Sequence, residues 1–363
     1  MTMKKRGIVL LLAMLANSIT VFGQSISLTE LEIPVKTDAV VLTLEEATQK
    51  ALAHSTTLKN SNMDLQISEQ KLESEEKNIA GGHTFQQLLN YIKQNANYTT
   101  SKLSQEVAQE GVKFSLKQVY IEIINKEREI AFTKQSIKNT EKELLIAKTK
   151  VKLGLISEQE WNNQELNYQK TITNVQQQEI AVKNAYQSLA QLINMDTENY
   201  QLTLEPVYEP LTLEMTLDTY IKGKINTDPN IKQKQISLET AESEAKFTHA
   251  TVPETTTADE EADNSVAKAE LSLADEKQNL KTKIENCYDT ILNLEANYQQ
   301  NLKELETLKK QLLITQKKYE LKQNTELDVL KAKQSIAEKE SEIIGQIYEH
   351  MLLMEQFENP YLS

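Results

Sequence analysis

The chain has 363 residues, of which 39% are hydrophobic, 6% aromatic and 26% charged, and it contains only 8 glycines and 6 prolines. So few turn-forming and aromatic residues exclude an ordinary globular domain with one large core, and they favour long amphipathic helices that bury a narrow seam. The formal net charge of −13 argues against a nucleic-acid-binding surface, because no basic stripe offsets it. Disorder is the competing interpretation, and the regular apolar spacing described below argues against it.

The segment 1–23 is typical of a secretory signal peptide. Lys4, Lys5 and Arg6 form a cationic start, an apolar run begins at Ile8, and small-residue spacing precedes an expected cleavage after Gly23. A retained membrane anchor is the weaker alternative, because the apolar run is short and interrupted by polar residues. No later segment offers about 18 uncharged apolar residues in a row. We therefore expect an exported chain with a formal charge of −16 and no transmembrane helix.

Six helices follow an N-terminal extended segment at 24–41. Their expected ranges are 45–78, 104–152 and 158–195 in one half, and 218–247, 266–322 and 326–357 in the other. An extended linker at 201–214 separates the halves and contains Pro206 and Pro210. This linker and the N-terminal segment alternate apolar and polar residues, which predicts a small patch of β-structure at the waist of the molecule.

The two halves are related by an internal duplication. The stretch 42–66 matches 215–239, and 116–151 matches 284–319 in a slightly shifted register. An apolar residue recurs at every seventh position along each long helix, namely Leu116, Ile123, Ile130, Ile137, Leu144 and Val151, and then Ile284, Ile291, Tyr298, Leu305, Leu312 and Tyr319. Such spacing keeps one stripe against neighbouring helices along its whole length. We expect a mainly α fold of tandem-duplicated long coiled-coil helical hairpins, as in the protomer of an α-barrel, with repeats at 42–200 and 215–363.

A tight turn interrupts the helical pattern once in each half. The turns are found in the stretches "KVKLGLISEQEW" and "KYELKQNTELDV", which align in the same register as the two long helices. Gly154 can take a backbone conformation that other residues resist. Ser157 precedes Glu160 by three positions, as in a capping box, and Thr325 and Asp328 repeat that spacing. Two ordinary capped hairpins would account for these residue types without any function, and the residues alone leave that alternative open.

The duplication, the openings "LTLEEA" and "INTDPNI", the two turns and the signal peptide together make the chain resemble the TolC-type outer-membrane efflux protein family. The resemblance covers nearly the whole mature chain. It implies a homotrimer in which three chains form a hollow helical barrel joined to a membrane-spanning β-barrel. It further implies docking, through the turns, to a membrane-fusion adaptor protein that works with an inner-membrane transporter.

The resemblance also implies where the functional residues lie. The second turn departs from the family pattern, since Lys322 and Asn324 stand where the family commonly has a glycine and a basic residue, so docking there stays open. The expected channel entrance consists of Glu160 and Asp328. The expected adaptor-docking tip consists of Gly154, Leu155, Ser157, Asn324 and Thr325.

Two further segments depart from the family, which inserts two strands before each long helix. These segments are "AGGHTFQQLLNYIKQNANYTTSK" and "THATVPETTTADEEADNSVAKAE". Neither alternates over the roughly 9–11 residues of a spanning strand, and the second has five acidic residues between Glu254 and Asp263. We expect a β-barrel that is missing or vestigial, a turn near Gly81 and flexible loops in its place. Localisation is then the cell envelope, at the outer membrane by resemblance, with direct insertion doubtful.

The sequence offers no catalytic, cofactor or metal constellation. Its four histidines are scattered without metal-ligand spacing, and Cys287 is the only cysteine. We therefore expect a non-enzymatic export conduit without a cofactor and without a nucleic-acid partner. The alternative is a non-channel coiled-coil adaptor, or another structural or interaction protein of the cell envelope. An adaptor normally adds glycine-rich β-domains to its hairpin, and no such segment is visible.

Overall fold

The structure is a computed structural model, and it describes residues 18–21, 24–27, 40–81, 84–195, 200–251 and 257–362. The expected signal peptide lies mostly outside these residues and stays a prediction. The described elements are, in chain order, β1 (Ser18–Val21), β2 (Gln24–Ser27), β3 (Val40–Thr43), α1 (Leu44–His54), α2 (Thr56–Ile79), α3 (Phe85–Lys152), α4 (Glu158–Ile193), β4 (Tyr200–Thr203), α5 (Leu217–Thr227), α6 (Pro229–Thr251), α7 (Thr257–Glu320), α8 (Glu326–Glu358) and the short 3-10 helix η1 (Pro360–Leu362). The expected mainly α fold with a small β patch is confirmed.

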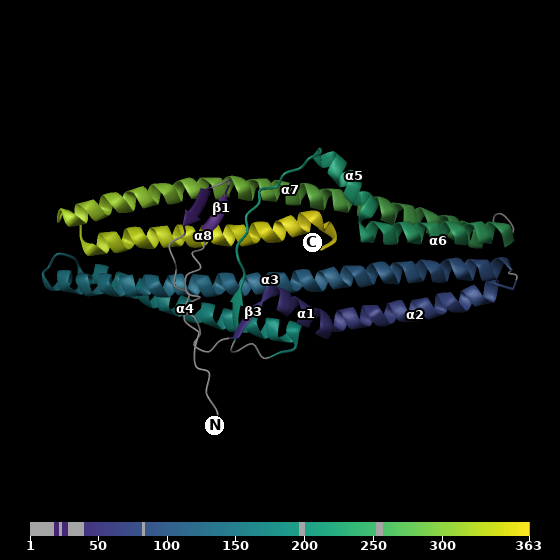
Figure 1. Ribbon diagram of the computed structural model, residues 1–363, viewed down its shortest axis with the longest axis horizontal. Coiled ribbons are helices and arrows are strands. Elements are labelled where there is room, and N and C mark those ends of the chain that lie inside the picture. The colour runs from purple at the N-terminus through teal and green to yellow at the C-terminus, as the bar shows by residue number, and fades with distance from the viewer. Residues whose placement is uncertain are drawn as a thin grey trace, which may run out of the picture.

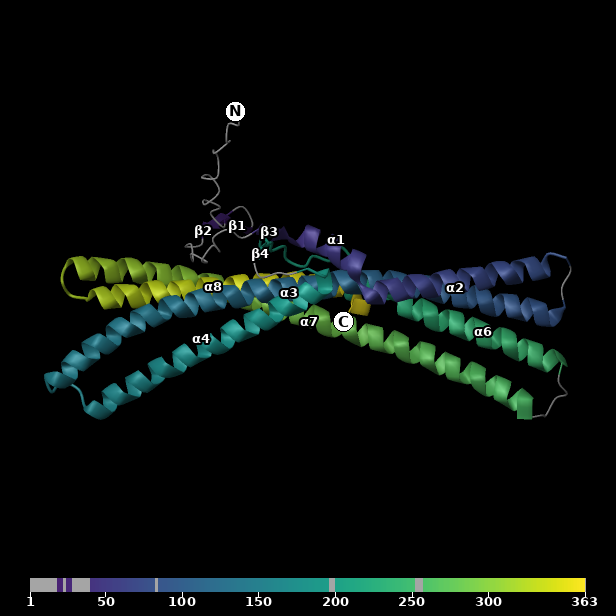
Figure 2. The ribbon, with the colours of Figure 1, turned by 90° about the horizontal axis from the view of Figure 1, so that it is seen from below.

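Two helices, α3 and α7, run through most of the length of the molecule (Figure 1). With 68 residues, α3 is about 100 Å long at a rise of 1.5 Å per residue. Helices α4 and α8 fold back along one end of this pair, and α2 and α6 fold back along the other end (Figure 1). Each half of the chain therefore forms two hairpins that point in opposite directions. Figure 2 shows that the two hairpins at each end diverge with distance from the waist.

The helices pack side by side in a layer. At the end that carries the α3–α4 and α7–α8 turns, α4 packs on α3, α3 on α8 and α8 on α7. At the opposite end the order is α2, α3, α6 and α7. Among the described residues, no comparable packing joins α4 to α7 or α2 to α7. Each four-helix layer therefore keeps two open edges.

The waist holds the largest hydrophobic cluster and a two-stranded parallel pairing of β3 with β4. Leu42 is paired with Leu202, and both side chains are buried. The fully buried Tyr120 of α3 joins the strands: its hydroxyl donates to the Leu42 carbonyl and accepts from the Thr203 N–H at 2.9 Å. The Tyr348 hydroxyl of α8 donates to the Leu204 carbonyl at 2.6 Å. Tyr120 and Tyr348, one from each half, thus connect this β patch to α3 and α8. Strands β1 and β2 form a separate antiparallel pair.

The seven-residue seam is buried near the waist and becomes less buried towards the turns. Ile123 and Ile291 are fully buried, whereas Val151 is half-buried and Tyr319 is exposed. Farther from the waist, small or polar residues occupy buried positions, including Ala147, Asn139 and Thr315. The diverging hairpins therefore bury less apolar surface per turn as they leave the waist, which lowers their stabilisation by the hydrophobic effect.

The long helices begin earlier than the sequence pattern predicts. Helix α3 starts at Phe85 instead of residue 104, and α7 starts at Thr257 instead of residue 266. Thr84 explains the first difference, because it forms a capping box with Gln87 in which each side chain bonds the other residue's N–H. The expectation of flexible loops was therefore wrong for 85–103 and 257–265, which are helical. The expected turn near Gly81 is present, although residues 82 and 83 lie outside the described residues.

The predicted helices 45–78 and 218–247 are each split in two. Ser55 ends α1 and caps α2, accepting a hydrogen bond from the Leu58 N–H at 3.1 Å. Asp228, at the matching position in the second half, accepts from the Ile231 N–H at 3.0 Å and precedes a proline. Serine and aspartate are favoured N-caps, and proline is favoured in the first helical position. These residue types therefore indicate the two breaks, whereas the apolar pattern does not indicate them.

No helix within the described ranges is both long enough and apolar enough to cross a membrane.

Candidate functional site

The turn between α3 and α4 closes the first hairpin with a glycine. Gly154 has a φ of +70°, in the left-handed region. Its N–H donates to the Val151 carbonyl at 2.9 Å, and the Leu155 N–H donates to the Lys150 carbonyl at 2.9 Å. This pair of bonds is a Schellman motif, which satisfies carbonyl groups at a helix C-terminus and requires one left-handed residue. Glycine meets that requirement with little strain.

The turn between α7 and α8 repeats this backbone with a lysine. Lys322 has a φ of +59°, and its N–H donates to the Tyr319 carbonyl at 2.9 Å. The Gln323 N–H donates to the Lys318 carbonyl at 2.8 Å. The departure from glycine at this position therefore leaves the turn type unchanged. It adds the strain of a left-handed residue with a side chain, on the order of 1–2 kcal/mol.

The helix-capping residues predicted after each turn are present, but only the second turn has a complete capping box. In the second turn, Thr325 and Asp328 form a full capping box, with the Thr325 N–H donating to Asp328 Oδ2 at 2.7 Å. These bonds, led by the one from the Thr325 N–H, lower the pKa of Asp328. In the first turn, Ser157 accepts from the Glu160 N–H at 3.1 Å, and the described contacts there include no return bond from the Glu160 side chain.

Exposed leucines stand on both turns. Leu155 is 67% exposed, Leu153 is 68% exposed, and Leu321, which matches Leu153 in the second half, is 69% exposed. Gln323 occupies the position that matches Leu155. Sequence reasoning named Leu155 alone. The alignment of the two turns would also have identified Leu153 and Leu321. Two apolar side chains at one turn and one at the other are thus available to a partner.

The structure brings the two turns to the same end of the molecule, where α3 lies against α8 (Figure 1). The Lys331 ammonium of α8 lies 3.2 Å from the Glu143 carboxylate of α3. Nearby, the Gln334 amide donates to Ser136 at 2.6 Å and accepts from Asn139 at 3.1 Å. These contacts join the two hairpins before they diverge, so both tips lie at the same end of the molecule but apart from each other (Figure 2).

The predicted site residues divide between the two tips. Gly154, Leu155 and Ser157 belong to the first turn, and Asn324 and Thr325 belong to the second. The two predicted entrance residues are exposed in the first turns of different helices, Glu160 in α4 and Asp328 in α8. Asp328 already bonds Thr325 within its own turn, so it has a structural role in capping α8.

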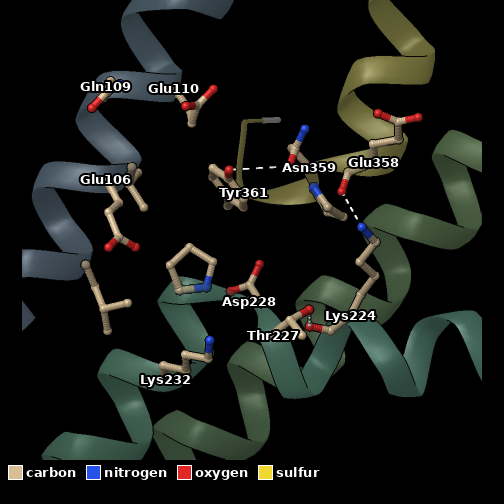
Figure 3. A pocket seen from close by; sticks show the side chains of 14 residues that line it. Glu106, Gln109, Glu110, Lys224, Thr227, Asp228, Lys232, Glu358, Asn359 and Tyr361 are labelled. Atoms are coloured by element: carbon tan, nitrogen blue, oxygen red, sulfur yellow. Dashed lines mark hydrogen bonds between the residues drawn. The ribbon is translucent and has the colours of Figure 1, made fainter.

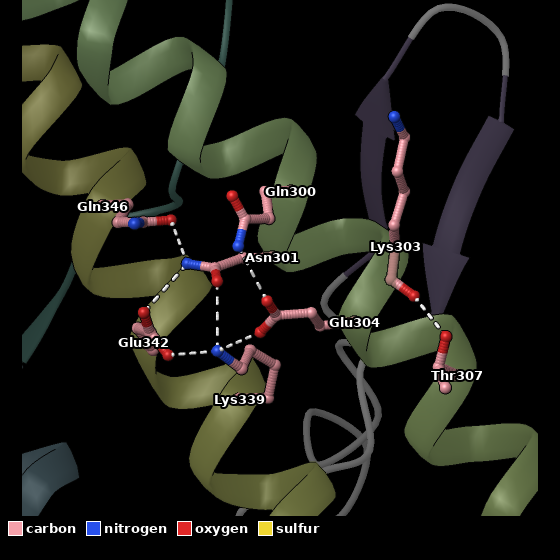
Figure 4. Close-up of polar contacts among 8 residues, drawn as sticks. All are labelled: Gln300, Asn301, Lys303, Glu304, Thr307, Lys339, Glu342 and Gln346. Carbon is pink, nitrogen blue, oxygen red and sulfur yellow. Dashed lines mark hydrogen bonds and ion pairs between the residues drawn. The ribbon is translucent and has the colours of Figure 1, made fainter.

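A polar network joins α7 to α8 on the waist side of the second turn (Figure 4). The side-chain amide of Asn301, which is buried, donates to Glu342 at 2.9 Å and to Gln346 at 3.0 Å. The Lys339 ammonium donates to the Asn301 side-chain oxygen at 3.0 Å and pairs with Glu304 at 2.9 Å. A buried asparagine bonded across a helix pair favours one register over others. The network therefore fixes the register in which α8 presents its turn.

The histidines that the structure describes make no arrangement typical of a metal site. His350 is buried beside Glu295, at 2.9 Å, and His249, near the end of α6, lies between two aspartates of α7. His83 lies outside the described residues. Over the described part of the chain, no group of three or more His, Cys, Asp or Glu residues is arranged to hold a metal ion. Burial raises the pKa of the Cys287 thiol, which makes it a weaker nucleophile.

Comparisons with known proteins identify the fold. No protein-family model matches the sequence, and no curated protein matches it. Among solved structures, the CmeC outer-membrane channel of Campylobacter jejuni matches with a TM-score of 0.68 at 11% identity, over 95% of this chain and 94% of CmeC. The outer-membrane protein VceC of Vibrio cholerae matches with a TM-score of 0.65 at 12% identity, over 86% and 95%. A membrane protein from Pseudomonas aeruginosa matches with a TM-score of 0.66 at 12% identity, over 90% and 92%.

The chain therefore has the fold of TolC-type outer-membrane efflux channels, at a sequence identity too low to show more than the fold. The similarity extends over nearly the whole length of these structures. Their descriptions name membrane and channel proteins, and they give no support for an enzymatic activity.

Proposed function

We propose that the protein is an export conduit of the cell envelope, a homotrimer whose helices form the wall of a tube. The observation that carries the proposal is the end-to-end match to the CmeC outer-membrane channel, the outer-membrane protein VceC and a third membrane protein, at TM-scores of 0.65 to 0.68. The open-edged layers support it, because a layer of four helices with unpartnered edges can close into a ring only with further copies. Three copies would supply a wall of twelve helices.

Apolar side chains on the edge helices support this assembly. Ile180 of α4 and Leu313 of α7 are each 60% exposed, although both lie on helices whose other faces pack within the chain. Exposed apolar residues along two edges of one layer are suited to burial against the edges of neighbouring copies. Their burial would contribute roughly 25 cal/mol per Å² of apolar surface.

The two turns are the proposed docking point for an adaptor. They lie at one end of the molecule, present three exposed leucines and each close a helical hairpin. Apolar side chains on preorganised turns lose little conformational entropy when they bind. In this proposal a membrane-fusion adaptor meets Leu155 and its neighbours, and an inner-membrane transporter supplies the substrate. Export to the cell envelope depends on the signal peptide predicted at 1–23.

Substitution of an edge residue tests the conduit against its alternative, a non-channel adaptor or structural coiled coil. We expect Ile180→Lys and Leu313→Lys to dissociate the assembly, because each buries a charge in the proposed interface. Lys substitution at Leu153, on the tip, should leave the assembly intact. Light scattering after size-exclusion chromatography measures the mass, and far-UV circular dichroism checks that the helices remain. An unchanged mass in both edge variants would favour the alternative.

A further inference from the structure

The two halves of the chain meet where α3 packs on α8 and α6. The duplication matches α3 with α7, α8 with α4 and α6 with α2. Helix α7 should therefore accept α4 and α2 as α3 accepts α8 and α6, but no comparable packing joins these helices within the described part of one chain. A neighbouring copy carries α4 and α2 on its open edge. The contact inside the chain can thus serve as a template for the contact between copies.

At the end where α3 packs on α6, a hydrogen bond joins the two halves. The Gln233 side-chain amide of α6 donates to the Ser104 hydroxyl of α3 at 3.1 Å. In the alignment of the two halves, Gln233 matches Asn60 of α2. The alignment of the long helices, continued without a gap along both, matches Ser104 with Ser272 of α7. An amide and a hydroxyl again stand at the matching positions, so the same bond is available between α2 and α7.

An ion pair at the same end is matched with its charges exchanged. The Lys93 ammonium of α3 lies 2.6 Å from the Glu244 carboxylate of α6. Glu261 of α7 stands at the position that matches Lys93. Lys71 of α2 stands at the position that matches Glu244, and both of these residues are exposed in the single chain. Opposite charges attract in either order, whereas two like charges would have opposed a contact between α2 and α7.

The end that carries the turns repeats an ion pair in its original order. The Lys142 ammonium of α3 lies 4.0 Å from the Glu326 carboxylate of α8. Lys310 of α7 matches Lys142. Glu158 of α4 matches Glu326 and is exposed in the single chain. Lys310 pairs with Glu306 of its own helix at 2.6 Å, on exposed surface where such a pair stabilises little, so Glu158 of a neighbouring copy can join it.

The exposed apolar side chains of α4 also occupy contact positions. Ile180 matches Tyr348 of α8, whose ring lies 5.9 Å from the Arg128 guanidinium of α3. Leu166 matches Gln334, which bonds two side chains of α3. Both Ile180 and Leu166 are more than half exposed in the single chain. The hydrogen bonds of Gln334 have no counterpart in the second contact, but α4 presents apolar residues along the side that α8 turns towards α3.

We propose that α4 and α2 of one copy pack on α7 of the next copy in the register in which α8 and α6 pack on α3 within a chain. This inference rests on the proposed tube, and it specifies which surfaces of two copies meet. The interfaces within and between copies then share one geometry. The pairs that meet across two copies are Asn60 with Ser272, Lys71 with Glu261, and Glu158 with Lys310.

Cross-linking between paired cysteines tests this register in the purified chain carrying Cys287→Ala. Asn60→Cys with Ser272→Cys, treated with the short reagent 1,2-bis(maleimido)ethane, should link copies into species of two and three chains in denaturing electrophoresis. Ser104→Cys with Gln233→Cys is the matched pair inside one chain, and it should react without any increase to the mass of two chains. Asn60→Cys with Asp289→Cys is the negative control and should link no copies, because Asp289 lies 17 residues, or about 25 Å, farther along α7.

Charge exchange gives an independent readout by light scattering. Lys71→Glu should raise the concentration needed for assembly by roughly threefold or more, because it places like charges opposite each other, and adding Glu261→Lys should restore the parent value. The register is overturned if the parent has the mass of an assembly but Asn60→Cys with Ser272→Cys links no copies, if the Asp289 control links them equally, or if the double charge exchange restores nothing. A parent protein with the mass of one chain would instead contradict the tube itself, so the two failures are distinguishable.

Discussion

Gly154 and Lys322, at matching positions of the two halves, adopt the same left-handed backbone in two equivalent turns, with φ values of +70° and +59°. Each donates its N–H to the carbonyl of the third residue before it, at 2.9 Å. The duplicated turn therefore has the same geometry in both halves, although only one half has the residue that adopts it without strain. The shared shape, with different residue types, indicates that the turn itself is what matters at both tips.

This relationship predicts opposite effects of two substitutions. Lys322→Gly should raise the free energy of unfolding by up to about 1 kcal/mol, because it removes left-handed strain. Gly154→Ala should lower it by about 1 kcal/mol, since alanine adopts the same φ less readily. Urea unfolding followed by circular dichroism measures both changes.

Gly111→Ala is the control for these turn variants. Gly111 lies within α3, and nothing lies within 4 Å of the Cβ that alanine would add, so this change should stabilise the protein by roughly 0.5–1 kcal/mol. If Gly154→Ala stabilised the protein as much as Gly111→Ala does, the requirement for a left-handed residue at the turn would be wrong.

The heptad seam predicts a large cost for a buried charge. Ile291→Asp and Ile130→Asp should each lower the free energy of unfolding by several kcal/mol, on the order of 3–5, because both side chains are buried between helices. Gln135→Asp, on an exposed face of α3, should change it by less than about 0.5 kcal/mol. Thermal melting of the three variants side by side provides the comparison, and equal losses would contradict the assignment of the seam.

His249 predicts a pH dependence at the α6–α7 end. Its ring bonds Asp259 at 2.5 Å and lies 3.2 Å from Asp263, and these contacts, Asp259 foremost, raise its pKa above 6.5. Because the folded-state pKa is raised, the stabilisation is fully present below the ordinary histidine pKa and is lost as the pH rises through the folded value. Melting temperatures should therefore fall more between pH 6 and pH 8 in the parent protein than in His249→Gln.

Titration of the His249 ring by NMR gives the pKa directly. A value at or below 6.5, the ordinary pKa of histidine, would show that the two aspartates do not hold a charged ring. A melting temperature with the same pH dependence in the His249→Gln variant would lead to the same conclusion.

The exposed leucine of the first turn predicts how an adaptor would distinguish the two tips. Leu155→Asp should abolish co-purification with the adaptor, since it puts a charge where the proposed contact is apolar, while helix content and mass stay unchanged. Gln323→Asp, at the matching position of the second turn, is the control and should have a smaller effect. Equal retention of the adaptor by all three proteins would remove Leu155 from the docking site.

Much of this fold is predictable from the sequence, because its long helices follow local patterns. The internal duplication aligns the two turns, and the recurrence from Leu116 onwards identifies the seam of α3. The break at Asp228 could also have been predicted from Pro229, which follows it. We did not predict this break, because the apolar periodicity continues across Asp228. The early start of α3 depends on a capping box at Thr84, which is a local signal within a segment expected to be a loop.

A cavity of about 440 Å³ that Asp228 lines was not predictable in the same way (Figure 3). Its lining comes from three segments, 103–110, 224–232 and 358–361, which only the tertiary structure brings together. The docking residues named from sequence lie in the two turns, and their role in docking stays a prediction.

The mass of the purified protein in solution tests the central claim most directly. Native mass spectrometry of the chain without residues 1–23, at low micromolar concentration, should give a species of three copies. The layer of α4, α3, α8 and α7 leaves two edges that neighbouring copies would cover. Images of the same sample by electron microscopy should show a ring with an open centre. A folded monomer or dimer at that concentration, with its helices intact, would contradict the proposal that this chain builds a tube.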